Sequence, residues 1–116
     1  MFKSSLNKGF SMVFRNGFEI SVQWGTGNYC SRRNDGDWDE STNHSHWSSQ
    51  TAEVAIFDTN VTNMNSLNGE DTIKFSSTND SVVGWMDTDQ IAQLMEFVRN
   101  AKTFEEVEIG VESLGI

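Results

Sequence analysis

Apolar and polar residues alternate most regularly on either side of Asn16-Gly17. The runs GFSMVF and FEISVQW flank this dipeptide, which is a strong short-range signal for a β-hairpin. A two-residue loop would place the apolar side chains of the two strands on opposite faces. A three-residue loop, residues 15–17, instead pairs apolar with apolar residues: Phe14 with Phe18, Met12 with Ile20 and Phe10 with Val22. The pattern therefore predicts the longer loop, with Gly17 in the left-handed conformation of a G1 bulge.

Three later stretches have the pattern of short strands. In residues 51–58 the apolar positions alternate, which predicts one buried face; they are Ala52, Val54 and Ile56. Residues 61–77 indicate a turn at Asn68-Gly69 followed by a short strand around Ile73 and Phe75. Residues 81–86 predict a further strand, in which Gly84 marks a bulge or a close approach of another chain segment.

The pattern changes to a helical period after residue 86. Apolar residues form one stripe along residues 87–103; they are Ile91, Leu94, Met95, Val98 and Ala101. Asp87 or Thr88 is suited to cap this helix, and Asp87 with Gln90 has the spacing of a capping box. Thr103 and Glu106 repeat that spacing and predict a second short helix or a turn.

Strands first and helices last predict an α+β fold. We expect one domain over residues 1–116, with an antiparallel sheet of about five short strands and a C-terminal helix packed on one face. Such a sheet leaves a face or an edge exposed, and closing a homo-oligomer is the common remedy. The candidate interface residues are Phe57, Val83 and Trp85, because they occupy strand positions that alternate with the core-facing ones.

Charge and composition exclude several classes of protein. The chain has 17 acidic and 8 basic residues, giving a net charge of −9. This balance argues against direct binding of nucleic acid or anionic membranes, which requires clustered Lys and Arg. No apolar run approaches the roughly 18–20 residues of a membrane span. The polar N-terminal residues and the single cysteine indicate the cytoplasm.

Residues 23–50 concentrate unusual side chains for a loop. Metal binding is one interpretation, because Asp35, Asp37 and Asp39 alternate as in a calcium loop; however, Glu40 and His46 occupy positions that such loops reserve for Gly and Glu. Zinc binding by His44, His46 and Cys30 is a second interpretation. Cys–His catalysis is a third, although no known local signature surrounds Cys30. The simplest alternative is that this stretch is a solvated acidic loop without a specific role. We predict no metal, no cofactor and no catalytic residue.

Small-ligand binding explains this stretch better. Gly25 and Gly27 permit a close backbone approach directly after a strand. The side chains that follow offer amide, aromatic and guanidinium groups suited to rings and phosphates. The predicted ligand-binding residues are Trp24, Asn28, Tyr29, Arg32, Arg33, Trp38 and Trp47, with Arg99 reaching the same site from the C-terminal helix. In the alternative interpretation, Arg32 and Arg33 only neutralise their acidic neighbours, and the tryptophans pack the loop down.

The stretches FRNGFEISVQWGTGNYCSRR, AEVAIFD and VVGWMDTDQIAQLMEFV resemble a family of small tailed-phage proteins over roughly residues 8–100, most specifically in the hairpin followed by GNYC. The order of strands and helix is also similar to that of phage counter-defence sponges, which sequester the cyclic ADP-ribose-type signal of Thoeris immunity. This resemblance implies a phage accessory protein in the host cytoplasm that sequesters a small nucleotide-like signal without catalysis. The alternative is an acidic inhibitor of a host nuclease or defence protein, in which Asp35, Asp37, Asp39 and Glu40 imitate phosphates.

Overall fold

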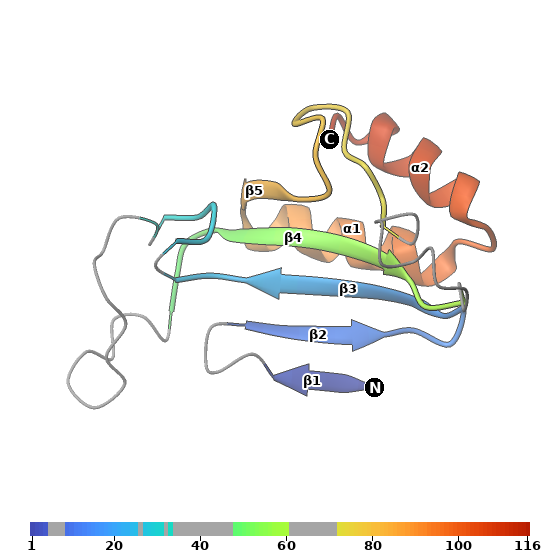
Figure 1. Ribbon diagram of the computed structural model, residues 1–116, viewed down its shortest axis with the longest axis horizontal. Helices are drawn as coiled ribbons and strands as arrows, with labels where there is room; N and C mark the ends of the chain where they lie inside the picture. The colour runs from blue at the N-terminus through green and yellow to red at the C-terminus, as the bar shows by residue number, and fades with distance from the viewer. Residues whose placement is uncertain (5–8, 26, 32, 34–47, 61–71) are drawn as a thin grey trace.

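The five strands in the described part of the chain form one antiparallel sheet in which neighbours in the chain are neighbours in space (Figure 1). The computed structural model describes residues 1–4, 9–25, 27–31, 33, 48–60 and 72–116. The strands are β1 (Phe2–Ser4), β2 (Gly9–Val13), β3 (Phe18–Gln23), β4 (Ala52–Asp58) and β5 (Val83–Met86). With two helices after the sheet, the predicted α+β class is confirmed.

One strand differs from the prediction. The segment around Ile73 and Phe75 is not a strand, because Thr72 and Phe75 form only isolated bridges, to Phe57 and Asp80 respectively. Both Ile73 and Phe75 are nevertheless fully buried. The fifth strand is instead β1, which pairs with β2 at the sheet edge. Its short polar sequence gave no alternating signal.

The β2–β3 hairpin has the predicted register. Met12 pairs with Ile20 and Phe10 with Val22, and the Phe14 amide donates to the Phe18 carbonyl. Gly17 has a φ of 89°. The three-residue loop and its left-handed glycine are therefore confirmed.

Two helices follow the sheet, α1 (Thr88–Asn100) and α2 (Phe104–Ser113). Asp87 and Gln90 form the predicted capping box of α1, and the Thr103 side chain caps α2 by accepting from the Glu106 amide. The second signal is thus a helix rather than a turn. Neither helix is long and apolar enough to cross a membrane, and no other helix occurs in the described residues.

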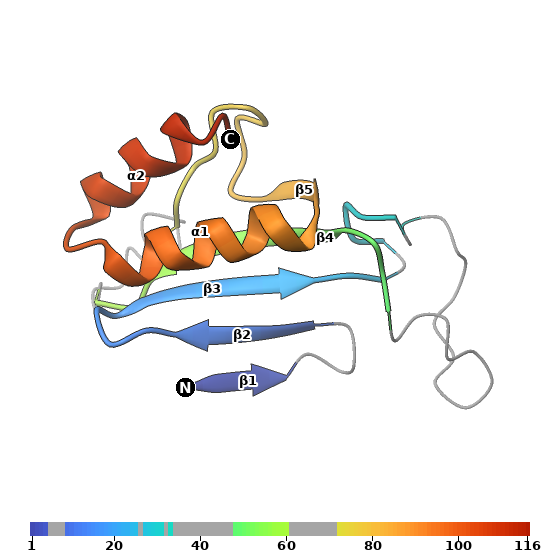
Figure 2. The same ribbon diagram turned by 180° about the vertical axis from the view of Figure 1, so that it is seen from behind.

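The α1 helix lies across one face of the sheet, behind β3 and β4 in Figure 1 and in front of them in Figure 2. The core between these layers combines the inward positions of β3 and β4 with the apolar stripe of α1. Three of its fully buried members are Ile20, Val54 and Leu94. The α2 helix adds Val107 and Val111 to the same core, so the described residues share a single core.

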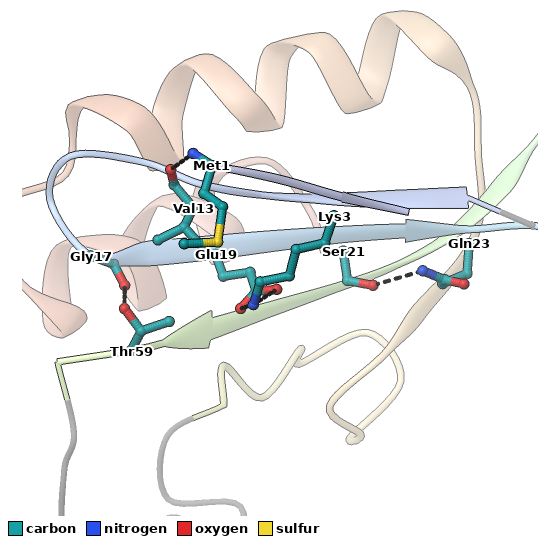
Figure 3. Close-up of polar contacts among 8 residues, drawn as sticks. All are labelled: Met1, Lys3, Val13, Gly17, Glu19, Ser21, Gln23 and Thr59. Atoms are coloured by element: carbon teal, nitrogen blue, oxygen red, sulfur yellow. Dashed lines mark hydrogen bonds and ion pairs between the residues drawn. The ribbon is translucent and has the colours of Figure 1, made fainter. Parts of the chain in front are cut away.

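The opposite face of the sheet carries polar side chains next to the apolar Val13, Ala55 and Phe57 in the part of the chain that the structure describes. Lys3 pairs with Glu19 at 3.3 Å, and Gln23 donates to the Ser21 hydroxyl at 3.3 Å (Figure 3). Near the hairpin, the Thr59 hydroxyl donates to the Gly17 carbonyl. Glu19, Ser21 and Gln23 alternate with the buried positions of β3, as a sheet covered on one face requires.

Candidate functional site

The strongest candidate site is built where β5 departs from regular pairing. Ala52 pairs with Met86 and Val54 with Val83, so that two residues of β5, Gly84 and Trp85, lie opposite the single residue Glu53. This is a β-bulge, as Gly84 predicted. The extra residue turns both Val83 and Met86 into the core. The prediction that Val83 belongs to an exposed interface is therefore wrong, because the bulge shifts the parity of the strand.

The bulge leaves Trp85 exposed in an uncommon backbone conformation. Its φ is 51°, in the left-handed region, and its residue surface is 56% exposed. A bulky residue in this region costs on the order of 1–3 kcal/mol. Burial does not compensate for that cost, and such strain is concentrated at functional sites. Trp85 is thus a candidate binding residue.

Residues 25–33 place a second aromatic ring beside Trp85. The Trp85 amide donates to the Tyr29 carbonyl at 2.8 Å, and the Tyr29 amide donates to Glu53 Oε2 at 2.9 Å. A Cβ added to Gly84 would lie 2.4 Å from the Tyr29 Cβ. Only glycine therefore permits this close approach, and it brings the two ring centroids to 5.7 Å at an interplanar angle of 43°.

Arg33 completes the cluster. Its guanidinium carbon lies 4.2 Å from the Tyr29 ring centroid, and its Nη1 donates to the Gly27 carbonyl at 2.9 Å. Among the described residues, Arg33 forms no ion pair with a carboxylate. Within the described part of the chain, this bond engages one of the five guanidinium N–H groups. We call Tyr29, Arg33 and Trp85 the aromatic site.

The loop that carries Tyr29 and Arg33 is held by its own backbone. Cys30 is buried, where its sulfur accepts from the Gly25 amide at 3.3 Å. The Arg33 amide donates to the Cys30 carbonyl at 3.0 Å. Cys30 is thus a packing residue at the centre of the turn. Within the described part of the chain, no three side chains gather as metal ligands, and His44 and His46 lie outside it.

A hollow of about 460 Å³ adjoins the aromatic site. It is lined by Tyr29 and Trp85 and by polar residues of the preceding segment, among them Ser77, Thr78 and Asp80. Hydroxyl and carboxylate oxygens at such a rim are suited to accept hydrogen bonds from hydroxyl groups of a ligand. The hollow therefore combines stacking surfaces with polar groups.

Trp24 belongs to a different hollow. It lines a groove of about 390 Å³ between the N-terminal half of α1 and the sheet, with Phe10, Met86 and Ile91 among its walls. The Trp24 Nε1 atom is buried without a hydrogen-bond partner in the described structure. Among the described residues, none lines both hollows. Trp24 is thus near the aromatic site in sequence but is not part of it.

The predicted site residues are only partly brought together. Asn28 lies in the same turn as Tyr29 and Arg33, and its amide donates to the Gly25 carbonyl. Arg99 is not near them, because it lies at the C-terminal end of α1 in a hollow with Phe14 and Arg15, at the hairpin end of β3. Three predicted binding residues lie outside the described residues: Arg32, Trp38 and Trp47. The four acidic residues of the alternative interpretation also lie outside them: Asp35, Asp37, Asp39 and Glu40.

Sequence reasoning missed the role of Trp85 in this cluster. It placed Trp85 at an oligomer interface and gave the nearby polar residues, such as Asp80, no role. The signal was Gly84 next to Trp85 in a short strand, because a glycine that marks a bulge also redirects the residue after it.

Comparison of the chain with models of known protein families, with curated protein sequences and with solved structures gives no match. The resemblance to phage proteins therefore remains an expectation from sequence.

Proposed function

We propose that this protein binds a small nucleotide-like ligand at the aromatic site without chemically changing it. The observation that carries the proposal is the exposure of Trp85 in a strained conformation beside Tyr29 and Arg33. Base–aromatic stacking contributes about 1–3 kcal/mol per base. Arg33 supplies a charge-assisted donor for phosphate, and the hollow beside the rings has room and acceptors for sugar hydroxyls.

Calorimetric titration with a panel of linear and cyclic nucleotides tests this function. Trp85→Ala is expected to weaken binding about ten- to a hundredfold. Arg33→Ala is expected to weaken binding by a similar factor, and only for ligands that carry phosphate. Ile109→Ala is the matched control, because Ile109 is an exposed apolar residue on α2, away from the site. If no nucleotide binds below about millimolar concentration, the proposed function is wrong.

The biological setting that we propose is a phage accessory protein that sequesters a host defence signal in the cytoplasm. This part rests on the sequence resemblance and not on the geometry. The ligand recovered after denaturation of a saturated complex is expected to have an unchanged mass. Conversion of the ligand would contradict sequestration and indicate an enzyme.

A second candidate is an acidic inhibitor of a host protein. The α2 helix favours it, because Glu105, Glu108 and Glu112 are all exposed and the last turn of α2 has no basic residue. Replacing these three residues by Gln is expected to remove activity in this candidate and to leave nucleotide binding unchanged. Trp85→Ala has the opposite expected pattern, so the two candidates are distinguishable.

We also propose that the protein forms a homo-oligomer. Trp85 is exposed and Phe57 is half-buried, so two of the three expected interface residues keep some free surface. Sedimentation of wild-type protein and of Trp85→Ala tests this. A wild-type monomer at high micromolar concentration would exclude the oligomer and leave the ligand site unaffected.

A further inference from the structure

Every polar atom of the Asn16 side chain is bonded. Its Nδ2 donates to the Val98 and Ala101 carbonyls at 2.8 Å each, with the Arg99 carbonyl at 3.2 Å. Its Oδ1 accepts from the Phe18 amide at 3.1 Å. Carbonyls only accept and a backbone amide only donates, so these partners fix the orientation of the Asn16 amide.

These bonds close the C-terminal end of α1. The last carbonyls of a helix have no partner within the helix. The left-handed glycine that often closes this end is absent, because neither the C-cap Ala101 nor the following Lys102 is a glycine or has a positive φ. The Val98 carbonyl also accepts from the Ala101 amide at 3.3 Å. Asn16 adds donors to the Val98, Arg99 and Ala101 carbonyls from the hairpin, across a sequence separation of 82–85 residues. We call this set of contacts the Asn16 latch.

The same residue begins an Asn-Gly dipeptide, which is chemically reactive when the chain is free to move. The Gly17 nitrogen attacks the side-chain carbonyl carbon of Asn16, and a five-membered succinimide forms as ammonia leaves. Water then opens the ring to give aspartate or isoaspartate. The net change consumes one water and releases one ammonia.

In the folded protein both reacting groups are engaged. The Gly17 N–H donates to the Phe14 carbonyl at 2.9 Å, and the amide that must leave is the donor of the latch. Asn60 also holds this turn, by donating to the Asn16 carbonyl at 3.0 Å. Attack requires that these bonds break together, which means opening the hairpin away from α1.

We propose that Asn16 is a spontaneous deamidation site that the native fold blocks and that unfolding opens. After the reaction, the native hydrogen bonds of Asn16 cannot form again. The product carboxylate has no N–H to donate to Val98 or Ala101, and it adds a negative charge at the negative end of the α1 dipole. Isoaspartate also lengthens the backbone between positions 16 and 17, which disturbs the hairpin register. A molecule that unfolds long enough to react does not recover the Asn16 latch.

The reaction is followed by peptide mass spectrometry on native and urea-unfolded samples kept at the same pH and temperature. Deamidation at Asn16 is expected to be at least about tenfold slower in the native sample, because reaction through unfolding scales with the small unfolded population. Asn100-Ala101 is a slow internal reference, because the side chain of alanine crowds the attacking nitrogen. Equal rates at Asn16 in the two samples would overturn the proposed block.

The consequence of the reaction is tested with Asn16→Asp, with Asn16→Ala as the uncharged variant. Asn100→Asp is the matched control, because it places a new carboxylate at the same helix end, where the Asn100 side chain donates to the Glu96 carbonyl of α1 itself rather than bridging to the hairpin. The urea concentration at the midpoint of unfolding is expected to be highest for Asn100→Asp, lower for Asn16→Ala and lowest for Asn16→Asp. A failure of Asn16→Asp alone to fold agrees with this order. A midpoint for Asn16→Asp equal to that of Asn100→Asp would overturn the proposal that deamidation destabilises the fold by removing the Asn16 latch.

Discussion

The two ends of β3 both carry turns with glycine, a polar side chain and an arginine, yet they use these residues differently. At the hairpin end, the Asn16 side chain is bonded at both polar atoms and Gly17 supplies the positive φ. At the other end, Gly25 and Gly27 also have positive φ, but so does the exposed Trp85. Gly84 there lets Tyr29 approach β5. The first turn stabilises the fold. At the second turn, the strained backbone of Trp85 lowers stability and is not offset by burial of the side chain, which is the property expected of a binding site.

The largest expected effect is at the hairpin end. Asn16→Ala removes the donors to Val98 and Ala101 and the acceptor of the Phe18 amide. At about 1 kcal/mol for each lost bond, the free energy of unfolding is expected to fall by about 3 kcal/mol, as measured by urea titration. The affinity of the folded fraction for a ligand of the aromatic site is expected to stay unchanged. A loss of affinity without a loss of stability would reverse the roles assigned to the two ends.

Gly84→Ala tests the close approach at the other end. The new Cβ would lie 2.4 Å from the Tyr29 Cβ and 2.7 Å from its carbonyl oxygen, so the turn must shift. We expect a loss of about 2 kcal/mol in stability, within the usual range for overpacking. Ligand binding is expected to be lost as well, unlike in Asn16→Ala. Unaltered binding in this variant would show that the Tyr29 position does not matter for recognition.

Gly17→Val tests the left-handed position of the hairpin. A β-branched residue at this φ is expected to lower the free energy of unfolding by about 1–2 kcal/mol. A Cβ at Gly17 would also lie 2.4 Å from the Asn60 Oδ1, so the exposed Asn60 side chain must move and its bond to the Asn16 carbonyl is weakened. Gly17→Asn is the milder control, because asparagine tolerates this conformation better. Equal stability of wild type and Gly17→Val would contradict the assigned strain.

Trp85→Gly is expected to change stability in the opposite direction. Glycine adopts a φ near 51° without strain, which relieves on the order of 1–3 kcal/mol, while its greater freedom in the unfolded chain costs about 0.5–1 kcal/mol. The free energy of unfolding is therefore expected to rise by about 0.5–1 kcal/mol, although the contact with Tyr29 is lost. Ligand binding is expected to fall in the same variant. A decrease in stability of more than about 1 kcal/mol would show instead that Trp85 serves the fold.

The smallest expected effect lies between the two ends. Lys3→Ala removes the ion pair with Glu19, in which the lysine side chain is 49% exposed. Exposed pairs contribute about 0–1 kcal/mol, so a shift below about 0.5 kcal/mol is expected, and it should disappear at high salt. This variant sets the baseline against which the changes at the two ends of β3 are judged.

The sequence predicted the elements whose signals are local. The hairpin register follows from the parity of Phe10, Met12 and Phe14, and the capping box of α1 lies within four residues. The Asn16 latch was not predictable, because its partners are more than 80 residues away in sequence. The same holds for Arg99, whose place at the far end of α1 depends on the direction in which the helix crosses the sheet.

The aromatic site was predicted in part. Tyr29, Arg33 and Asn28 were expected to lie together because they share one turn, and the structure places them there. Trp24 was grouped with them by its position in sequence, but it follows the parity of Val22 and faces the α1 side. Trp85 was assigned to another surface, because a regular alternation cannot show where a bulge inserts a residue.

The long separation of the Asn16 latch also has a kinetic consequence. The sheet is assembled from strands that are neighbours in the chain, and such contacts tend to form early in folding. The latch closes a loop of more than 80 residues, whose closure is entropically costly and is not required for the first pairings. We therefore expect the latch to form after the rate-limiting step. Asn16→Ala should then leave the refolding rate nearly unchanged, and most of the lost stability should appear as a faster rate of unfolding. Stopped-flow measurements over a range of urea concentrations would show this as a shift of the unfolding arm alone.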